Sequence, residues 1–200
     1  VETCSGVNIY TASMVIDNIL ADAPGNFYLT GNLNTTLTFG SVTLTPASGG
    51  DMFLAKFNSA GTCLWASKST GSGWERGRAL TLDAVGNVYI GGDFTGTGTF
   101  GVYSYSASSQ DVFVAKYNGS TGSCMWAKKG GGATEEYMKS LTTEAGGNIL
   151  MVTGFNSSSA VFGTYILSTN GSQDIGVVRY NASNGTEQMA ISFGSPKSED

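Results

Sequence analysis

The chain has 200 residues, a formal net charge of −5 and no histidine. Charged residues make up 12% of it, about half the usual share, while Gly, Ser, Thr and Asn together account for 44%. The acidic balance argues against nucleic acid as a partner, and the lack of histidine excludes Ser-His-Asp catalysis, Cys-His catalysis and histidine metal sites. With 40% apolar residues, the chain can nevertheless build a hydrophobic core.

Residues 1–13 stand apart from the rest and hold one β-like stretch, Val7 to Tyr10, which we expect to form an N-terminal strand or extension. This end lacks the basic and apolar pattern of a signal peptide, as would a mature secreted chain or an excised fragment. No run of 18 apolar residues occurs, so the sequence predicts no transmembrane helix and no membrane insertion.

The remainder is a tandem repeat with a period of about 61 residues. Its clearest columns are Gly25-Asn26, Gly86-Asn87 and Gly147-Asn148; Asp51, Asp111 and Asp174; and Trp65-Ala66, Trp126-Ala127 and the degraded Met189-Ala190. Many ordered columns at one period predict stacked units of the same local structure. We therefore divide the chain into an extension, 1–13, and three repeats, 14–74, 75–135 and 136–198.

The second unit shows the predicted elements in order. Residues 78–83 alternate apolar and polar side chains, residues 83–87 supply a tight turn, and residues 88–94 complete a hairpin. Residues 100–106 predict a short extra strand pair or a wide loop, and two further strands are predicted at 111–117 and 124–128. Because the third strand is apolar on both faces, its sheet should be buried on both sides. No helical periodicity is present, so the fold class is all-β.

Small antiparallel sheets stacked on one another are typical of the four-stranded blades of a β-propeller. A β-solenoid is the alternative, but its coils are shorter than this repeat. The pattern D-x-x-G-N-x-Y-x-x-G, then D-x-F-x-A-K-[FY], then G-x-x-x-W-A resembles the SBBP-type β-propeller repeat over residues 14–193. The resemblance implies a secreted or surface-exposed protein with no shared catalytic residues. Since propellers close with four to eight blades, three repeats predict part of a larger or assembled propeller.

Three cysteines are compatible with three buried thiols, or with one disulfide and a third, free or intermolecular thiol. Cys63 and Cys124 occupy equivalent positions in neighbouring units, which should place them too far apart to bond. Cys4 precedes the first repeat and could bond to one of these two cysteines or to a neighbouring chain; we predict a Cys4–Cys63 disulfide and a free or intermolecular Cys124. Six sequons predict N-glycosylation in a secretory pathway, at Asn34, Asn118, Asn156, Asn170, Asn181 and Asn184.

Other recurring side chains have a structural interpretation beside a functional one. The acidic turn column Asp22, Asp83 and Glu144 predicts turn capping, with calcium binding as the weaker alternative. The third strand begins with an Asp column and ends with the Lys56, Lys116 and Arg179 column; five residues apart, the two should pair across units, or the long side chains should snorkel.

The tryptophans and a pair of glutamates complete the candidate residues. Trp65 and Trp126 should pack between units, whereas Trp74, in a Gly-rich loop, is predicted as an exposed contact residue. The adjacent Glu135 and Glu136 are predicted to lie in a solvated loop rather than to form a carboxylate pair for glycoside hydrolysis.

These patterns predict a non-catalytic extracellular structural or adhesive protein that needs no cofactor and acts through assembly. Its partners would be further copies of itself, other propeller repeats or surface proteins. A carbohydrate-binding propeller lectin is the alternative, with glycans as ligands. The loops after Gly31, Gly92 and Gly154 share size and polarity but not side chains, which favours the structural interpretation.

Overall fold

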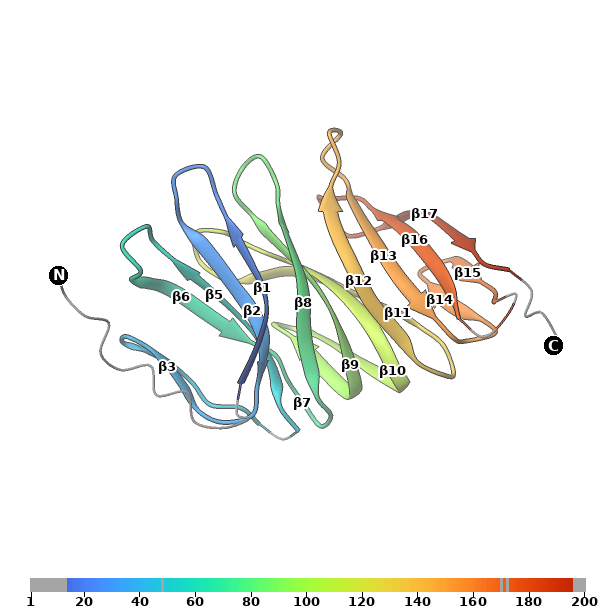
Figure 1. The fold of residues 1–200 in the computed structure, drawn as a ribbon, viewed down its shortest axis with the longest axis horizontal. Coiled ribbons are helices and arrows are strands. Elements are labelled where there is room, and N and C mark those ends of the chain that lie inside the picture. The colour runs from blue at the N-terminus through green and yellow to red at the C-terminus, as the bar shows by residue number, and fades with distance from the viewer. Residues whose placement is uncertain (1–13, 48, 170, 172, 196–200) are drawn as a thin grey trace.

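The computed structural model describes residues 14–47, 49–169, 171 and 173–195, and these form seventeen β-strands and no helix. Every strand pair among them is antiparallel, which confirms the predicted all-β class. No helix long and apolar enough to cross a membrane occurs in this part of the chain. Figure 1 shows three main sheets standing side by side in chain order.

Sheet 1 has the strand order β1-β2-β5-β6. Its strands are β1 (Met14–Ala21), β2 (Phe27–Leu33), β5 (Asp51–Phe57) and β6 (Cys63–Lys68). Between β2 and β5 lies a small hairpin of β3 (Leu37–Phe39) and β4 (Val42–Leu44), and within the described ranges these two strands pair only with each other.

Sheet 2 repeats this order in four strands. They are β8 (Glu75–Leu82), β9 (Val88–Phe100), β10 (Tyr103–Tyr117) and β11 (Cys124–Gly131). The distal parts of β9 and β10 form the hairpin that corresponds to β3–β4, with Phe100 opposite Tyr103. Residues 100–106 therefore belong to a strand pair rather than a wide loop. The short strand β7 (Thr70–Gly71) pairs with β9.

Sheet 3 has the order β12-β13-β16-β17. Its strands are β12 (Glu136–Thr143), β13 (Ile149–Phe155), β16 (Asp174–Tyr180) and β17 (Glu187–Phe193). Its hairpin consists of β14 (Ala160–Phe162) and β15 (Tyr165–Leu167) and is joined to sheet 2, because β14 pairs with the end of β11. Within the described ranges, the three sheets form an open row and not a closed barrel or propeller.

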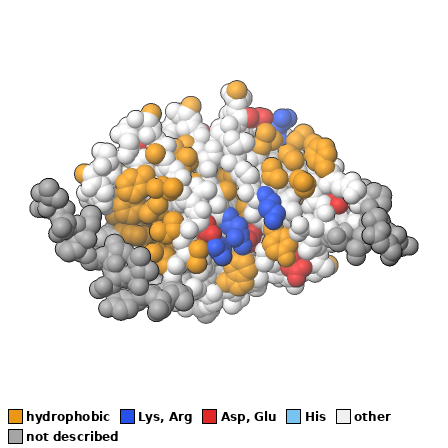
Figure 2. Space-filling view, in the orientation of Figure 1, with side chains coloured by type: hydrophobic (Ala, Val, Ile, Leu, Met, Phe, Trp, Pro, Cys, Tyr) orange, Lys and Arg blue, Asp and Glu red, His pale blue; other side chains and the backbone are white. Residues whose placement is uncertain are grey.

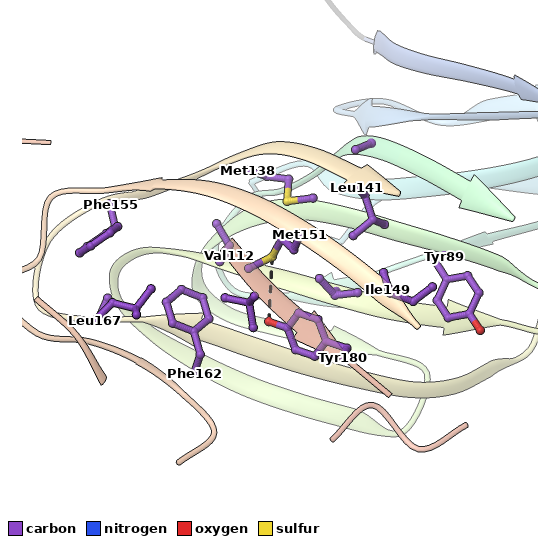
Figure 3. Close-up of a cluster of buried hydrophobic side chains, with 14 of the residues drawn as sticks. Tyr89, Val112, Met138, Leu141, Ile149, Met151, Phe155, Phe162, Leu167 and Tyr180 are labelled. Atoms are coloured by element: carbon purple, nitrogen blue, oxygen red, sulfur yellow. Dashed lines mark hydrogen bonds between the residues drawn. The ribbon is translucent and has the colours of Figure 1, made fainter. Parts of the chain in front are cut away.

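The core lies mainly between the sheets. In β5, Met52 and Leu54 face sheet 2, whereas Phe53, Ala55 and Phe57 pack with the β3–β4 hairpin on the opposite face. The prediction that the third strand is buried on both sides is thus confirmed for β5, whereas the equivalent strand of the last sheet keeps Ile175 exposed on one face. Figure 3 shows the cluster between sheets 2 and 3, where the Tyr180 hydroxyl of β16 reaches the sulfur of Met151 on the neighbouring strand of the same sheet.

Polar contacts align the first strands of the three sheets along one edge. The Arg76 guanidinium of β8 holds the Asp17 carboxylate of β1, with Nη2–Oδ1 at 2.5 Å and Nε–Oδ2 at 2.8 Å. The Thr81 and Thr143 hydroxyls of β8 and β12 lie 3.0 Å apart. The fourth strands therefore fall along the opposite edge, and each sheet presents a whole face to its neighbour.

Candidate interaction surfaces

The joint between sheets 1 and 2 is built around one tryptophan and one backbone carbonyl. The Trp65 indole Nε1 donates to the Gly119 carbonyl at 3.2 Å, and Lys56 Nζ donates to the same oxygen at 2.8 Å. The ring lies against Gly122, where a Cβ atom would approach it to 2.6 Å. A larger residue at this position would push the indole away, so the ring can pack here only because the position is glycine.

The joint between sheets 2 and 3 repeats this arrangement. Trp126 Nε1 and Lys116 Nζ donate to the Ala182 carbonyl at 3.2 and 3.0 Å. The Trp126 ring packs on Gly185, where a Cβ atom would come within 2.7 Å. The prediction that both tryptophans pack between units is confirmed.

The turns that receive a tryptophan share a length that the first turn lacks. Gly122 N donates to Asn118 O and Gly185 N to Asn181 O, each four residues back at 2.8 Å. In sheet 1 the corresponding turn is one residue shorter, and Gly61 N donates to Asn58 O, three residues back. Within the described chain, no sheet comes before sheet 1, so no tryptophan of a preceding sheet packs on this shorter turn.

The charged columns pair differently from the prediction of contacts between units. Asp51 and Asp111 are bound by lysines of the adjacent strand in their own sheet, Lys68 at 2.5 Å and Lys129 at 2.8 Å. Lys116 lies 3.2 Å from Asp83 of its own sheet while it also reaches the next sheet. The sequence columns do not reveal this pairing, because it depends on the register between the third and fourth strands.

A pair of buried carboxyl groups marks each joint. Beside sheet 1, Ser69 Oγ donates to Glu75 Oε2 at 2.9 Å, and Asp51 Oδ1 and Glu75 Oε1 have no hydrogen-bond partner among the described residues. Burial raises the pKa of Glu75 to about 7; repulsion from Asp51 adds to this, and the hydrogen bond from Ser69 opposes it. Glu75 therefore titrates near neutral pH.

The second pair consists of Asp111 and Glu136, and it corrects an expectation. Glu136 was predicted to lie in a solvated loop, yet it is fully buried as the first residue of β12. Its carboxylate accepts backbone N–H groups from Gly132 at 2.8 Å and Ser157 at 3.3 Å. Burial raises the pKa of both Asp111 and Glu136. The 61-residue spacing between Glu75 and Glu136 was the available signal for this second pair.

The acidic turn residues cap their hairpins, as predicted. Asp22 and Asp83 each accept from the backbone and side-chain nitrogens of an asparagine four residues later, Asn26 or Asn87, at 2.8 and 2.9 Å. Burial would raise the pKa of Asp83, but the hydrogen bonds from Asn87 and Lys116 lower it overall. The described residues contain no group of three side chains suited to a metal, and calcium binding at these turns stays a prediction.

The outward face of sheet 3 is apolar. Figure 2 shows hydrophobic side chains gathered at this end of the row. Paired neighbours on β16 and β17 share this face, and Ile175, Ile191 and Phe193 are 51%, 42% and 56% exposed. Exposed apolar patches of this kind mark interaction surfaces in soluble proteins.

The outward face of sheet 1 is also apolar, and Figure 2 shows a second hydrophobic area over this sheet. The β3–β4 hairpin covers part of it through Phe39 and Leu44. Ile19, paired with Leu29, remains 65% exposed, and Phe27 is half-buried. On sheet 2, the corresponding face lies buried against sheet 1, so the two ends of the row expose faces that are covered inside it.

The predicted contact residue Trp74 is half-buried and lines a shallow depression of about 230 Å³. The other lining residues are Asn32, Asn34, Gly49 and Arg76. An indole beside amide and guanidinium groups is a combination that suits a small polar ligand with an apolar face. The positions 61 residues after Trp74 and Arg76 hold Glu135 and Tyr137, so the depression is not repeated.

The cysteines and sequons have the following places. Cys63 and Cys124 are half-buried thiols, and burial raises the pKa of both, that of Cys124 to about 12. Cys4, Asn170 and the stretch Val7 to Tyr10 lie outside the described residues, so the Cys4–Cys63 disulfide stays a prediction. Of the described sequon asparagines, Asn34 and Asn184 are exposed, and Asn118, Asn156 and Asn181 are half-buried.

No protein-family model matches the chain, and no curated protein matches it significantly. The resemblance to the SBBP repeat therefore rests on the sequence columns alone.

Proposed function

We propose that the chain is a non-catalytic, extracellular structural or adhesive module made of β-propeller-type blades, and that it acts by assembling with further blades. The observation that carries this proposal is the exposure, at both ends of the row, of apolar faces that are buried wherever two sheets meet. Exposing such faces to water is unfavourable by about 25 cal/mol for each Å². Covering them with another blade removes this cost.

The SBBP resemblance supports the same proposal, because it implies blades that stack around an axis. The first strands β1, β8 and β12 follow one another along one edge, as the inner strands of propeller blades do. Exposed sequons at Asn34 and Asn184 suit a secreted protein.

Sedimentation velocity over a range of concentrations tests assembly directly. The proposal expects species heavier than the 20.7 kDa chain whose proportion grows with concentration. A single compact monomer at all concentrations would contradict it. Secretion from a glycosylating host, followed by intact-mass measurement before and after glycosidase treatment, tests the extracellular assignment.

The second candidate function is carbohydrate binding at the Trp74 depression. Its support is the half-buried indole beside the side chains of Asn32 and Arg76, because aromatic rings and polar side chains together fit the apolar and hydroxyl faces of a sugar. A glycan array should show saturable binding that Trp74→Ala abolishes while Asn184→Gln leaves it unchanged. Absence of binding to any glycan class would eliminate this candidate.

A further inference from the structure

The two internal joints contain the same strand addition. After sheet 1, the strand β7 pairs with the hairpin of sheet 2, Thr70 opposite Thr99. After sheet 2, the end of β11 pairs with the hairpin of sheet 3, Gly131 opposite Val161. In both cases, the chain that leaves the fourth strand of one sheet becomes an edge strand on the hairpin of the next.

Among the residues that the structure describes, the acceptor half of this joint is vacant in sheet 1. Thr38 stands 61 residues before Thr99 and occupies the same place in the β3–β4 hairpin, one residue before the Phe that flanks the turn. Among the described residues, β3 pairs only with β4. An unpaired edge is a template for strand addition by another chain.

The hairpin geometry directs the backbone of Thr38 toward that vacant edge. The loop Gly40-Ser41 has two residues, so the flanking pair Phe39–Val42 exchanges hydrogen bonds. Pairs alternate along an antiparallel ladder. The Thr38–Thr43 pair therefore turns its N–H and C=O groups outward, Thr38 toward the edge that receives a strand in sheets 2 and 3.

The donor half is present in sheet 3. Gly194 follows β17 as Gly131 ends β11, and each lies against the buried aspartate at the start of the third strand. A Cβ atom on Gly194 would stand 1.9 Å from Asp174 Oδ1, and one on Gly131 would stand 2.2 Å from Asp111 Oδ1. Gly194 is exposed, and Phe193 beside it presents its ring to solvent.

The two end faces also differ from the internal joints, and both differ in the contact that a tryptophan makes there. Sheet 3 has Met189 where sheets 1 and 2 have tryptophan, so it brings no indole N–H to the next sheet. Sheet 1 has the shorter turn closed by Gly61 in place of the longer turns that receive an indole. Sheet 3 therefore lacks the indole that it would contribute to such a contact, and sheet 1 lacks the longer turn that would receive it.

We propose that a second copy of this chain docks head to tail, with residues 193–195 of one copy adding as a strand to β3 of the next. The outward face of sheet 3 then covers the outward face of sheet 1. Figure 1 places β3 and β17 at opposite ends of the row, so one molecule cannot close this contact on itself. The inference rests on the proposed function of assembly, and because the contact is heterologous it generates rings or open filaments.

Complementary variants test the joint. Thr38→Pro removes the edge N–H of the acceptor, and Phe193→Glu places a charge in the donor face at a residue that is 56% exposed. Each variant alone should sediment as a monomer at concentrations where the unchanged chain forms oligomers. An equimolar mixture should form dimers of twice the 20.7 kDa chain mass and nothing larger, because it holds one intact donor and one intact acceptor.

Thr43→Pro is the matched control, since it places proline in the same hairpin on the other edge, and it should assemble like the unchanged chain. If the unchanged chain forms oligomers that neither Thr38→Pro nor Phe193→Glu alters, the joint is wrong and assembly uses another surface. If the mixture of variants stays monomeric, or if one variant alone forms dimers, the head-to-tail contact is also wrong. A monomeric unchanged chain overturns both this joint and the proposed function.

Discussion

The inner joints and the end faces of this molecule carry similar apolar side chains in different surroundings. At the joints, each tryptophan is anchored by a hydrogen bond to a carbonyl of the next sheet and packs on a glycine that leaves room for it. At the ends, Met189 takes the place of the indole, and the first turn is too short to match the others. Hydrophobicity is thus common to all faces, whereas the specific polar anchor is confined to the contacts made within the chain.

The largest expected effect comes from removing an anchor. Trp126→Ala should lower the free energy of unfolding by about 3–5 kcal/mol, because it deletes a buried ring and leaves a cavity between sheets 2 and 3. Met189→Ala, at the equivalent place on the open face, should cost less than about 1 kcal/mol, because Met189 is only partly buried. Urea denaturation of both variants measures the difference, and equal losses would show that the joint is no stronger than a surface contact.

The glycines that receive the rings should come next. Gly122→Ala should cost about 3 kcal/mol, because its φ of +71° disfavours any Cβ atom and the new methyl group would collide with Trp65. Gly61→Ala shares the positive φ but has no atom within 4 Å of the added Cβ, so we expect about 1–2 kcal/mol. If thermal unfolding gives the same loss for both, the contact with the indole is not restrictive.

Substitutions of two adjacent valines on β16 allow the stability contributions of an inner face and an end face to be compared. Val178 is fully buried in the joint with sheet 2, while Val177 lies on the outward face. Val178→Thr should destabilise the fold by about 2 kcal/mol, since it buries a hydroxyl group in an apolar cluster. Val177→Thr should change stability by less than about 0.5 kcal/mol. Chemical denaturation decides between this expectation and a uniform response along the strand.

The last comparison concerns pH and the carboxyl pair at the first joint. Glu75 has a folded-state pKa of about 7, above its value of about 4.3 in an unfolded chain. The folded state therefore binds more protons between these values, and stability should fall as pH rises through this window. These two pKa values correspond to a loss of about 2.5 kcal/mol between pH 5 and pH 8, so we expect the melting temperature to drop by roughly 5–10 °C.

Glu75→Gln should flatten that slope, because the amide cannot titrate. Glu136→Gln is the comparison at the second joint and should flatten it less, since both oxygens of Glu136 already accept backbone N–H groups. Differential scanning calorimetry across the pH range gives both slopes. An unchanged slope in Glu75→Gln would show that another group controls the titration.

The repeat and its strands could be predicted because they depend on local patterns. Three features depend only on residues that are close together in the sequence. They are the two-residue alternation of apolar side chains, the Gly-Asn turns and the third strand that is apolar on both faces. The capping by Asp22 and Asp83 belongs to the same class, since it links residues four positions apart. Burial of Glu136 was missed because a pair of adjacent glutamates resembles a solvated loop when its partners are not known.

By itself, the sequence determined an all-β chain with three repeats, and the physical reason is that strand and turn preferences act over a few residues. The tertiary structure decided which contacts hold the repeats together. Only register across strands pairs Asp51 with Lys68, and only the stacking of sheets brings the Trp65 indole to a carbonyl 54 residues away. These distant contacts also distinguish the inner joints from the ends, where the apolar faces are exposed.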